Sequence, residues 1–174
     1  MLFRSAGGER NGVTAATADL FDGKRLIITP LDTTDEHAFA GIYRFWQNLG
    51  FQVATMSAEH HDTVLAATSH LPHILAFALV AMLGRKDEQR EIFKYAAGGF
   101  KDFSRIASSD PTMWLDICMA NKDELMPLLR EFRGELQTLE NMLIERQNQA
   151  LYDEFVYANQ SRQRFLEVFG SGNV

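Results

Sequence analysis

Hydrophobic and polar residues follow strand-like and helix-like patterns in turn along the first part of the chain. Arg25–Thr29 is a short aliphatic and β-branched run that ends at a proline, which predicts a strand, because proline has no N–H for a further ladder bond. Thr33 and Glu36 then stand at capping-box spacing, and apolar residues recur at helical spacing over Phe39–Leu49. Phe51–Met56 predicts a second strand, so the segment reads strand, helix, strand.

The helix between these strands favours parallel pairing through a right-handed crossover. Two parallel strands with one helix do not form a stable unit, because parallel sheets are normally covered on both faces and flanked by further strands. We therefore interpret residues 1–57 as the C-terminal remnant of a larger α/β domain whose earlier strands are not in this chain. The alternative is a small α+β cap that belongs to the following domain.

Residues 58–174 show no further strand pattern and are predicted to form an all-helical domain. Glu59–Leu83 reads as a long helix that Pro72 should kink or split, because proline removes one helical hydrogen bond. Asp87–Ala96 reads as a shorter helix that Gly98-Gly99 ends. The fold class predicted for the whole chain is therefore mainly α, with a β-α-β segment in front of the helices.

Capping residues mark the beginning of the later helices. Asp110-Pro111 is a cap followed by proline at the first helical position. Asn121 with Glu124 opens a helix whose apolar stripe is rich in leucine, and a final helix covers roughly Asn148–Phe169. We expect these last two helices to form an antiparallel pair.

The last two helices carry more apolar residues than one face of a helix pair can bury. Near the C-terminus alone these residues are Leu151, Phe155, Val156, Phe165, Leu166, Val168 and Phe169. Burial against a second subunit accounts for them economically, and burial within the same domain is the alternative.

Composition and charge narrow the range of partners and compartments. The 174 residues carry 17 Lys+Arg against 23 Asp+Glu, a net charge of -6, which has the wrong sign for a protein that binds nucleic acid by neutralising phosphates. The longest apolar stretch, Ile74–Leu83, is shorter than the ~20 residues of a membrane span, so we expect no membrane partner. The N-terminus lacks the pattern of a signal peptide, and the single Cys118 excludes an internal disulfide, so we expect a cytoplasmic location.

Four of the five histidines fall within the fourteen residues His60–His73, the densest concentration of histidine in the chain. On a helix His70 and His73 share a face, and Ser69 lies on the same turn, which is compatible with a pocket wall. The alternatives are a solvated helix start with a packed His70, or a metal site. The spacing matches no zinc signature, so no metal is predicted.

A second group of residues suits an anion. Lys101 and Arg105 follow Gly98-Gly99 and stand one helical turn apart, so a short helix after the glycines would present two cations on one side. Arginine matches a carboxylate with two parallel hydrogen bonds. The alternative is that Asp102 and Asp110 neutralise these cations in ordinary surface pairs.

These two groups together carry a resemblance to a known family. Ser69-His70-Leu71-Pro72-His73, followed by the run from Gly98-Gly99-Phe100-Lys101-Asp102-Phe103-Ser104-Arg105 to Trp114, resembles the prephenate dehydrogenase family (prephenate, arogenate or cyclohexadienyl dehydrogenase). The likeness extends upstream through Ser57–Asp62 and Gly12–Ala16 and downstream into Asn121-Lys122, and it covers essentially residues 6–145.

The resemblance implies a Rossmann domain that binds NAD or NADP, here represented by its remnant in residues 1–57, followed by a helical dimerisation domain over residues 58–174. It implies NAD(P)-dependent oxidative decarboxylation of prephenate to 4-hydroxyphenylpyruvate, or of arogenate to tyrosine. The implied partners are prephenate or arogenate, a second copy of the chain, and tyrosine as a possible feedback inhibitor.

The resemblance also implies roles for individual residues. Arg105 corresponds to the arginine that holds a substrate carboxylate, and His73 to the histidine that lines the substrate pocket. Further polar positions of that pocket correspond to Ser69, His70 and His61, and Lys101 adds positive charge. Glu9 corresponds to the acidic residue that closes the site near the domain junction.

Two departures from the family pattern limit what we expect of this chain. Phe3–Gly8 stands where the family has the His-Pro dipeptide with its catalytic histidine, so no catalytic residue is assigned. The G-x-G-x-x-G dinucleotide loop is absent, and residues 1–5 match no family pattern. We therefore expect an N-terminally truncated chain that is inactive alone.

Two other functions remain open from the sequence. The chain could be a free-standing helical module that assembles with a partner or senses tyrosine without catalysis. A metal-dependent hydrolase built on His61, His70 and His73 is a weaker alternative.

Overall fold

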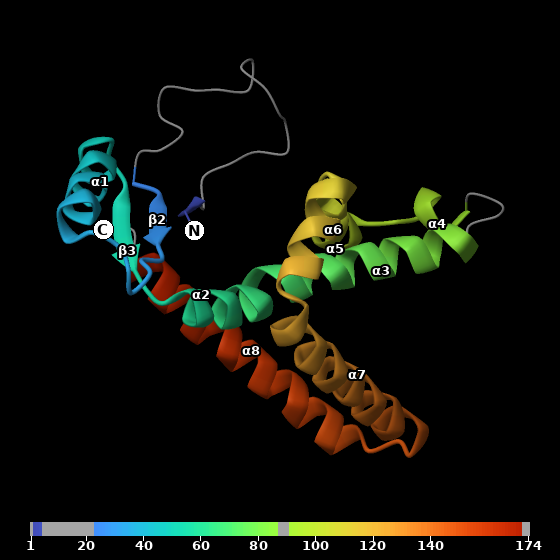
Figure 1. Cartoon of the computed structure of the whole chain (residues 1–174). Helices are drawn as coiled ribbons and strands as arrows, with labels where there is room; N and C mark the ends of the chain where they lie inside the picture. Colours follow the sequence, from blue (N-terminus) through green and yellow to red (C-terminus); the bar gives the residue numbers. More distant parts are fainter. Residues whose placement is uncertain (1, 5–22, 87–90, 172–174) are drawn as a thin grey trace. The chain divides into compact units, whose positions relative to one another are not determined.

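The computed structural model describes residues 2–4, 23–86 and 91–171, with side chains for residues 23–86 and 91–168 (Figure 1). Its elements, in chain order, are β1 (Leu2–Arg4), β2 (Arg25–Ile28), α1 (Glu36–Asn48), β3 (Gln52–Thr55), α2 (Ala58–Leu65), η2 (Ala66–His70), α3 (Leu71–Lys86), α4 (Glu91–Lys94), α5 (Gly98–Ser104), η3 (Arg105–Ser108), α6 (Pro111–Ala120), α7 (Lys122–Ile144) and α8 (Asn148–Ser171). η2 is a π-helical turn and η3 a 3₁₀ turn.

The predicted fold class is confirmed: a short α/β segment precedes a helical remainder. β2 and β3 pair in parallel, as the crossover helix requires, with Leu26 opposite Val53. β1 adds a third strand, antiparallel to β2, that the sequence does not suggest, because three residues are too few to show an alternating pattern. The sheet order is β1-β2-β3.

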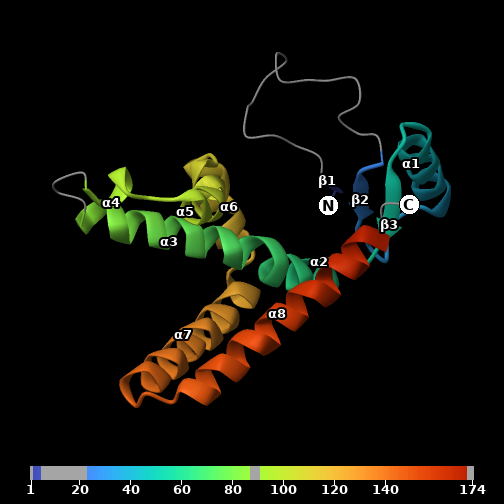
Figure 2. The ribbon, with the colours of Figure 1, turned by 180° about the vertical axis from the view of Figure 1, so that it is seen from behind.

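Helix α1 covers one face of this sheet in both views (Figures 1 and 2). Leu26, Ile28 and Phe51 form a buried cluster, and Trp46 of α1 meets Phe51 edge-to-face at 5.2 Å between ring centroids. The Tyr43 hydroxyl donates a hydrogen bond of 3.1 Å to the carbonyl oxygen of Val53. The small core therefore fixes α1 directly on the strand that follows it.

The cap of α1 differs from the predicted capping box. The helix begins at Glu36, and the side chain of Asp35 accepts the hydrogen bond from the backbone N–H of Ala38. The predicted cap is Thr33. Its neighbour Thr34 accepts, through its hydroxyl, a hydrogen bond from the backbone N–H of Leu31 in the preceding turn. Aspartate and threonine are both favoured N-cap residues, so Thr33 and Asp35 are competing caps in the sequence.

The long helix around Pro72 is continuous rather than split. A π-helical turn over Ala66–His70 joins α2 to α3, and the backbone N–H of Leu71 bonds to the carbonyl oxygen of Ala66, five residues back. The predicted kink at Pro72 is thus replaced by a widened turn just before the proline. Such turns are one of the known ways in which a helix accommodates an irregularity.

This continuity changes what helix length says about membranes. Within the described residues, Ala58–Lys86 is one helix of 29 residues that is long and apolar enough to cross a membrane by length and composition alone. The core helix of a soluble protein satisfies the same criterion, so this helix alone is weak evidence for a membrane span. The apolar stretch Ile74–Leu83 is therefore part of a longer helix, and length no longer excludes a span.

The two glycines before Lys101 begin a helix rather than end one. The helix predicted over Asp87–Ala96 is represented among the described residues by α4, and Gly98 and Gly99 are the first residues of α5. Helix α5 and the turn η3 pack against α3. The predicted Asp110 cap with Pro111 at the start of α6 is confirmed, since the carboxylate of Asp110 accepts from the backbone N–H of Met113 at 2.9 Å.

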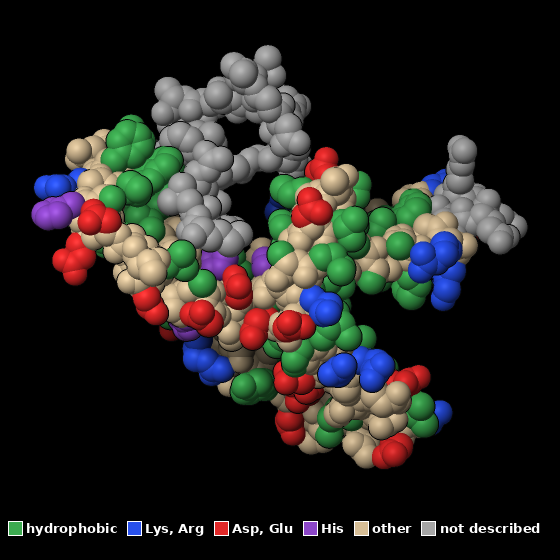
Figure 3. All heavy atoms as spheres, viewed as in Figure 1, with side chains coloured by type: hydrophobic (Ala, Val, Ile, Leu, Met, Phe, Trp, Pro, Cys, Tyr) green, Lys and Arg blue, Asp and Glu red, His purple; other side chains and the backbone are tan. Residues whose placement is uncertain are grey.

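The chain divides into two compact units, Met1–Leu128 and Leu129–Val174. The second unit contains the later part of α7 and helix α8, joined by a turn in which Arg146 has a positive φ of 54°. We call this unit the C-terminal hairpin; its two helices run back along one another in Figures 1 and 2, as predicted. Hydrophobic side chains lie among charged ones on its surface (Figure 3).

Candidate functional site

Three histidines of the first unit converge on one tryptophan and one asparagine. The group comprises His61 of α2, His70 of the π-helical turn, His73 of α3, Trp114 of α6 and Asn121, which follows α6; we call it the histidine cluster. All but His73 are buried, and His73 is half-buried. Buried polar side chains are normally hydrogen-bonded, so their partners define the site.

Trp114 contacts two of the imidazoles. The ring of His73 stacks on it with centroids 3.6 Å apart and an interplanar angle of 19°, and His70 meets it edge-on at 6.1 Å. The indole Nε1 of Trp114 is buried and has no hydrogen-bond partner among the described residues. Trp114 therefore forms a rigid wall for the two histidines and leaves one donor N–H without a protein acceptor in the described part of the chain.

His73 is held in one orientation by the backbone of the π-helical turn. Its Nδ1 lies 2.8 Å from the carbonyl oxygen of Ser69, which only accepts, so Nδ1 carries the proton and Nε2 is the free position of the neutral ring. Burial lowers the pKa of His73, and the positive charge of Arg105 lowers it further, while the hydrogen bond to Ser69 raises it. The ring is thus kept neutral close to a guanidinium.

The π-helical turn brings Asp62 and His70 onto one side of the helix. Successive residues of an α-helix are rotated by about 100°, so eight residues would leave the two positions about 80° apart. The turn absorbs one residue without a corresponding rotation, which reduces the angle to about 20°. The amide of Asn121 consequently reaches both, with Nδ2 2.8 Å from the carbonyl oxygen of Asp62 and 3.0 Å from Nδ1 of His70.

His61 completes the buried side of the cluster. It is 3% exposed, and its Nδ1 lies 2.8 Å from the carboxylate of the half-exposed Asp62. Next to it, Thr63 donates to the carboxylate of Glu124 at 3.1 Å, which ties α2 to the first turn of α7. These contacts fix α2 against the helices that carry Trp114 and Asn121.

The structure brings some of the predicted site residues together and leaves others apart. His61, Ser69, His70 and His73 gather as expected, and Arg105, at the start of η3, is close enough for its charge to act on His73. Lys101 is exposed on α5 and makes no side-chain hydrogen bond or ion pair within the described part of the chain. Glu9 and Gly12–Ala16 lie outside the described residues.

Trp114 and Asn121 are the members that sequence reasoning does not assign to the site. Both stand inside the runs that carry the family resemblance, yet their roles depend on contacts across 41 or more positions of the chain, such as Asn121 with His70 at a separation of 51. The sequence predicts Asn121 as the cap of the next helix, whereas its side chain turns back to α2 and the π-helical turn.

The geometry gives no support to the metal-dependent hydrolase. Within the described residues there is no group of three His, Cys, Asp or Glu side chains placed to hold a metal ion. Cys118 of α6 is half-buried, and burial raises the pKa of its thiol, which disfavours the reactive thiolate.

The fold and the site define a class of protein: a short α/β segment with a parallel strand pair, followed by a helical domain in which three histidines gather near an arginine. Comparison with family models identifies it further. Residues 57–157 match the dimerization domain of prephenate dehydrogenase, and residues 5–55 match the nucleotide-binding domain of the same enzyme. The chain belongs to the prephenate dehydrogenase family.

Individual relatives agree with this assignment. The cyclohexadienyl dehydrogenase of Zymomonas mobilis is 38% identical over 159 residues, which make up 90% of this chain and 54% of that protein. The prephenate dehydrogenase of Bacillus subtilis is 34% identical over 158 residues, 90% of this chain and 43% of that protein. The chain therefore spans about half the length of the curated relatives it matches, and these relatives are oxidoreductases.

Solved structures show the same fold. Prephenate dehydrogenase from A. aeolicus, in complex with hydroxyphenyl propionate and NAD+, superposes with a TM-score of 0.87 at 37% identity, covering 94% of this chain and 58% of that one. The Synechocystis arogenate dehydrogenase superposes with a TM-score of 0.79 at 26% identity, covering 94% and 60%.

Proposed function

We propose that this chain supplies the substrate-binding and dimer-forming part of an NAD(P)-dependent prephenate or arogenate dehydrogenase. The overall reaction transfers a hydride from the substrate ring to the nicotinamide as carbon dioxide leaves, giving 4-hydroxyphenylpyruvate from prephenate or tyrosine from arogenate. The observation that carries the proposal is the packing of η3, which begins at Arg105, against α3, which carries His73 stacked on Trp114.

The electrostatics of the site suit an anionic ring acid. The chain as a whole is acidic, so a dianion such as prephenate needs a local concentration of donors. Arg105 provides a planar fork that matches a carboxylate, and the neutral imidazoles beside it add hydrogen-bonding positions without adding negative charge. Trp114 supports this site from behind, because its ring stacks on His73 and holds the imidazole in one plane.

The proposal includes tyrosine as a feedback inhibitor that binds at the same site, because it shares a carboxylate and a ring with the substrate. Selection between prephenate and arogenate is left to contacts beyond this cluster. The domain boundary between residues 57 and 58 and a cytoplasmic location are further parts of the proposal.

The described part of the nucleotide-binding segment does not itself fit a dinucleotide. The connection from β2 to α1, Thr29–Asp35, contains no glycine, and the N-terminus of α1 is occupied by the carboxylate of Asp35. A dinucleotide pyrophosphate needs a glycine-rich turn and a helix N-terminus open to an anion. We therefore assign no described residue to NAD or NADP.

The C-terminal hairpin supports the homodimer. None of its described side chains, residues 129–168, is buried, and Leu143, Ile144, Phe155, Phe165 and Val168 are each more than half exposed. Helices this amphipathic gain most of their stability from packing, so the hairpin needs a covering surface. The dimerization-domain match over residues 57–157 supports a second copy of the chain as that surface.

A chimera tests the proposed activity. Residues 6–174 of this chain would replace the matching segment of the Zymomonas mobilis cyclohexadienyl dehydrogenase, so that the position of the His-Pro dipeptide comes from that protein. Prephenate-dependent formation of reduced nicotinamide would be followed by absorbance. We expect activity in the chimera and none in the isolated chain. Turnover by the isolated chain would contradict the expected dependence on a separate nucleotide site, and an inactive but folded chimera would contradict the enzyme assignment.

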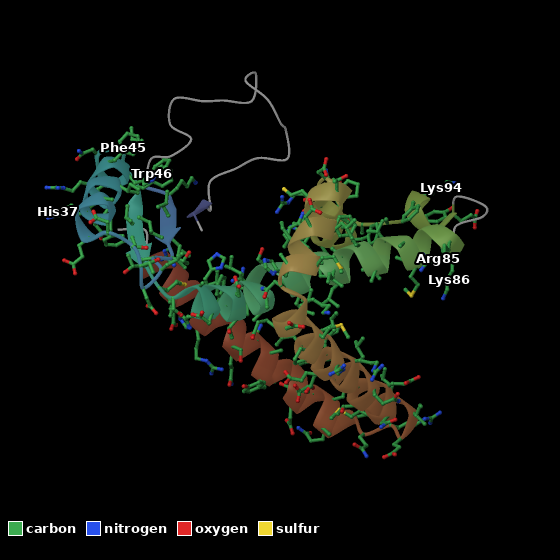
Figure 4. The ribbon with its side chains drawn as sticks, viewed as in Figure 1. His37, Phe45, Trp46, Arg85, Lys86 and Lys94 are labelled. Atoms are coloured by element: carbon green, nitrogen blue, oxygen red, sulfur yellow. The ribbon has the colours of Figure 1, made fainter. Side chains whose placement is uncertain are left out.

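The same chimera tests Arg105. Arg105→Ala is expected to cost about 2 to 5 kcal/mol of substrate binding, seen as a rise in KM for prephenate of about 30-fold or more with little change in KM for the nicotinamide cofactor. Arg85→Ala is the matched control, since Arg85 lies on the last turn of α3, twelve residues and about 18 Å of helix beyond His73 (Figure 4). Equal effects of the two substitutions would remove Arg105 from the substrate site.

A further inference from the structure

One amide group links three parts of the histidine cluster. Asn121 is 7% exposed, and its Nδ2 donates to the backbone carbonyl oxygen of Asp62 at 2.8 Å while lying 3.0 Å from Nδ1 of His70. His70 is equally buried, at 7% exposed. Both hydrogens of the amide nitrogen are therefore directed at buried acceptor positions of α2 and the π-helical turn.

The two contacts together determine where His70 carries its proton. A backbone carbonyl oxygen only accepts, so the end of the amide that faces Asp62 must be the NH₂ group. The same nitrogen faces Nδ1 of His70, and an amide nitrogen only donates, so Nδ1 must present its lone pair. A neutral His70 then carries its hydrogen on Nε2.

We propose that Asn121 is a positioning residue that holds His70 as a neutral imidazole with its proton on Nε2, so that His70 presents a fixed donor. His73 has the opposite arrangement, because its Nδ1–H is directed at Ser69 and its Nε2 is left as an acceptor. The cluster thus offers one donor and one acceptor from chemically identical rings. That this pair faces the substrate rests on the proposed function; the assignment of the proton does not.

The charges around His70 agree with a neutral ring. His61 and Asp62 face it from α2 and His73 from α3, while Trp114 of α6 presents an uncharged ring. Burial lowers the pKa of His70 most, His61 and His73 lower it further, and Asp62 raises it. Protonation at Nδ1 would also set an imidazole N–H against the amide N–H of Asn121, which adds a direct steric and electrostatic cost.

Nuclear magnetic resonance of the full chain with ¹⁵N-labelled histidine tests the assignment. We expect the Nδ1 signal of His70 in the unprotonated range and the Nε2 signal in the protonated range at neutral pH, with the reverse pattern for His73. Protonated Nδ1 on His70 in the unmodified chain would overturn the proposal without any variant being needed.

Asn121→Asp sharpens the test, because aspartate has the shape of asparagine but presents only acceptors. We expect the proton of His70 to move to Nδ1 and its pKa to rise, while the pattern of His73 is unchanged. Asn141→Asp, an exposed position on α7, adds the same charge outside the cluster and is expected to leave His70 as it was. An unaltered His70 in Asn121→Asp would overturn the positioning role.

Activity of the chimera separates this proposal from the proposed function. Asn121→Asp is expected to lower kcat/KM for prephenate by about tenfold or more at neutral pH and to shift its pH profile, whereas Asn141→Asp leaves both unchanged. If the proton of His70 moves but the pH profile does not, the positioning role stands and the assignment of His70 to the substrate pocket is wrong.

Discussion

The histidine cluster and the C-terminal hairpin use their side chains in opposite ways. In the cluster each ring has its orientation set by a partner within the chain, and Trp114 and Asn121 are buried. In the hairpin no described residue from 129 to 168 is buried, although its helices carry large apolar side chains. The first region is held by contacts within the chain, whereas the second leaves its large apolar side chains exposed.

With the proposed homodimer, the difference predicts which properties of the protein depend on its concentration. Ring orientation and proton placement in the cluster should be the same in a monomer and in a dimer, because the contacts that set them lie within residues 57–124. Helical stability of the hairpin should follow the concentration of its partner, as expected for a subunit interface.

The largest effect is expected from Trp114→Ala, which removes a buried side chain of the histidine cluster. Removing a buried indole leaves a cavity and takes away the ring on which His73 stacks, so we expect a loss of about 3 to 5 kcal/mol of stability. Denaturant unfolding measures it. Met113→Ala, a neighbouring and half-exposed position on the same helix, should change stability by less than about 1 kcal/mol. Similar losses in both variants would mean that Trp114 is not a core residue.

A smaller effect is expected from Phe155→Glu, which places a charge on the exposed apolar surface of the C-terminal hairpin. Phe155 is 58% exposed on α8, and a charge there would weaken self-association by about 2 kcal/mol, or about 30-fold, while the histidine signals stay in place. Sedimentation equilibrium gives the dissociation constant. Leu31→Glu, also exposed but before α1, is the control. A dimer that is equally tight in both variants would place the interface elsewhere.

The smallest effect is a dependence of stability on pH that arises in the cluster. Burial lowers the pKa of His70 and of His73 in the folded chain, so the unfolded chain binds protons at higher pH than the folded one. Their contribution to stability is full above the ordinary histidine pKa of about 6.5 and is lost as the pH falls below it.

Unfolding curves at pH 7.5 and pH 5.5 measure this loss. His70→Gln should reduce the difference between the two curves, whereas His37→Gln, which removes an exposed histidine of α1, should leave it unchanged (Figure 4). A chain that is equally stable at both pH values would contradict the neutral state of the buried rings.

Much of the fold could be predicted because the signals are local. Helix α1 and the Asp110-Pro111 start of α6 each depend on residues within about fifteen positions, and β2 and β3 pair through the single helix that connects them in sequence. The density of histidines between His60 and His73 likewise indicates where the candidate site lies. The functional roles assigned to Arg105 and the histidines stay predictions, since the geometry brings them together without a ligand.

The remaining features could not be predicted because they depend on contacts between distant segments. The π-helical turn places His70 where Asn121 can reach it, and nothing in the five residues Ala66–His70 favours a wider turn over an α-helical one. The proline that follows predicts a kink instead. The partnership of His73 with Trp114 likewise joins residues 41 positions apart.

The widened turn also constrains how this segment can change in evolution. Loss of a single residue between Ala66 and His70 would restore ordinary helical spacing, and gain of one would shift every later residue of the helix by about 100° relative to α2. Substitutions there alter chemistry one position at a time, whereas an insertion would rotate the whole later part of the helix relative to α2. Related chains should therefore accept substitutions across this turn far more readily than insertions.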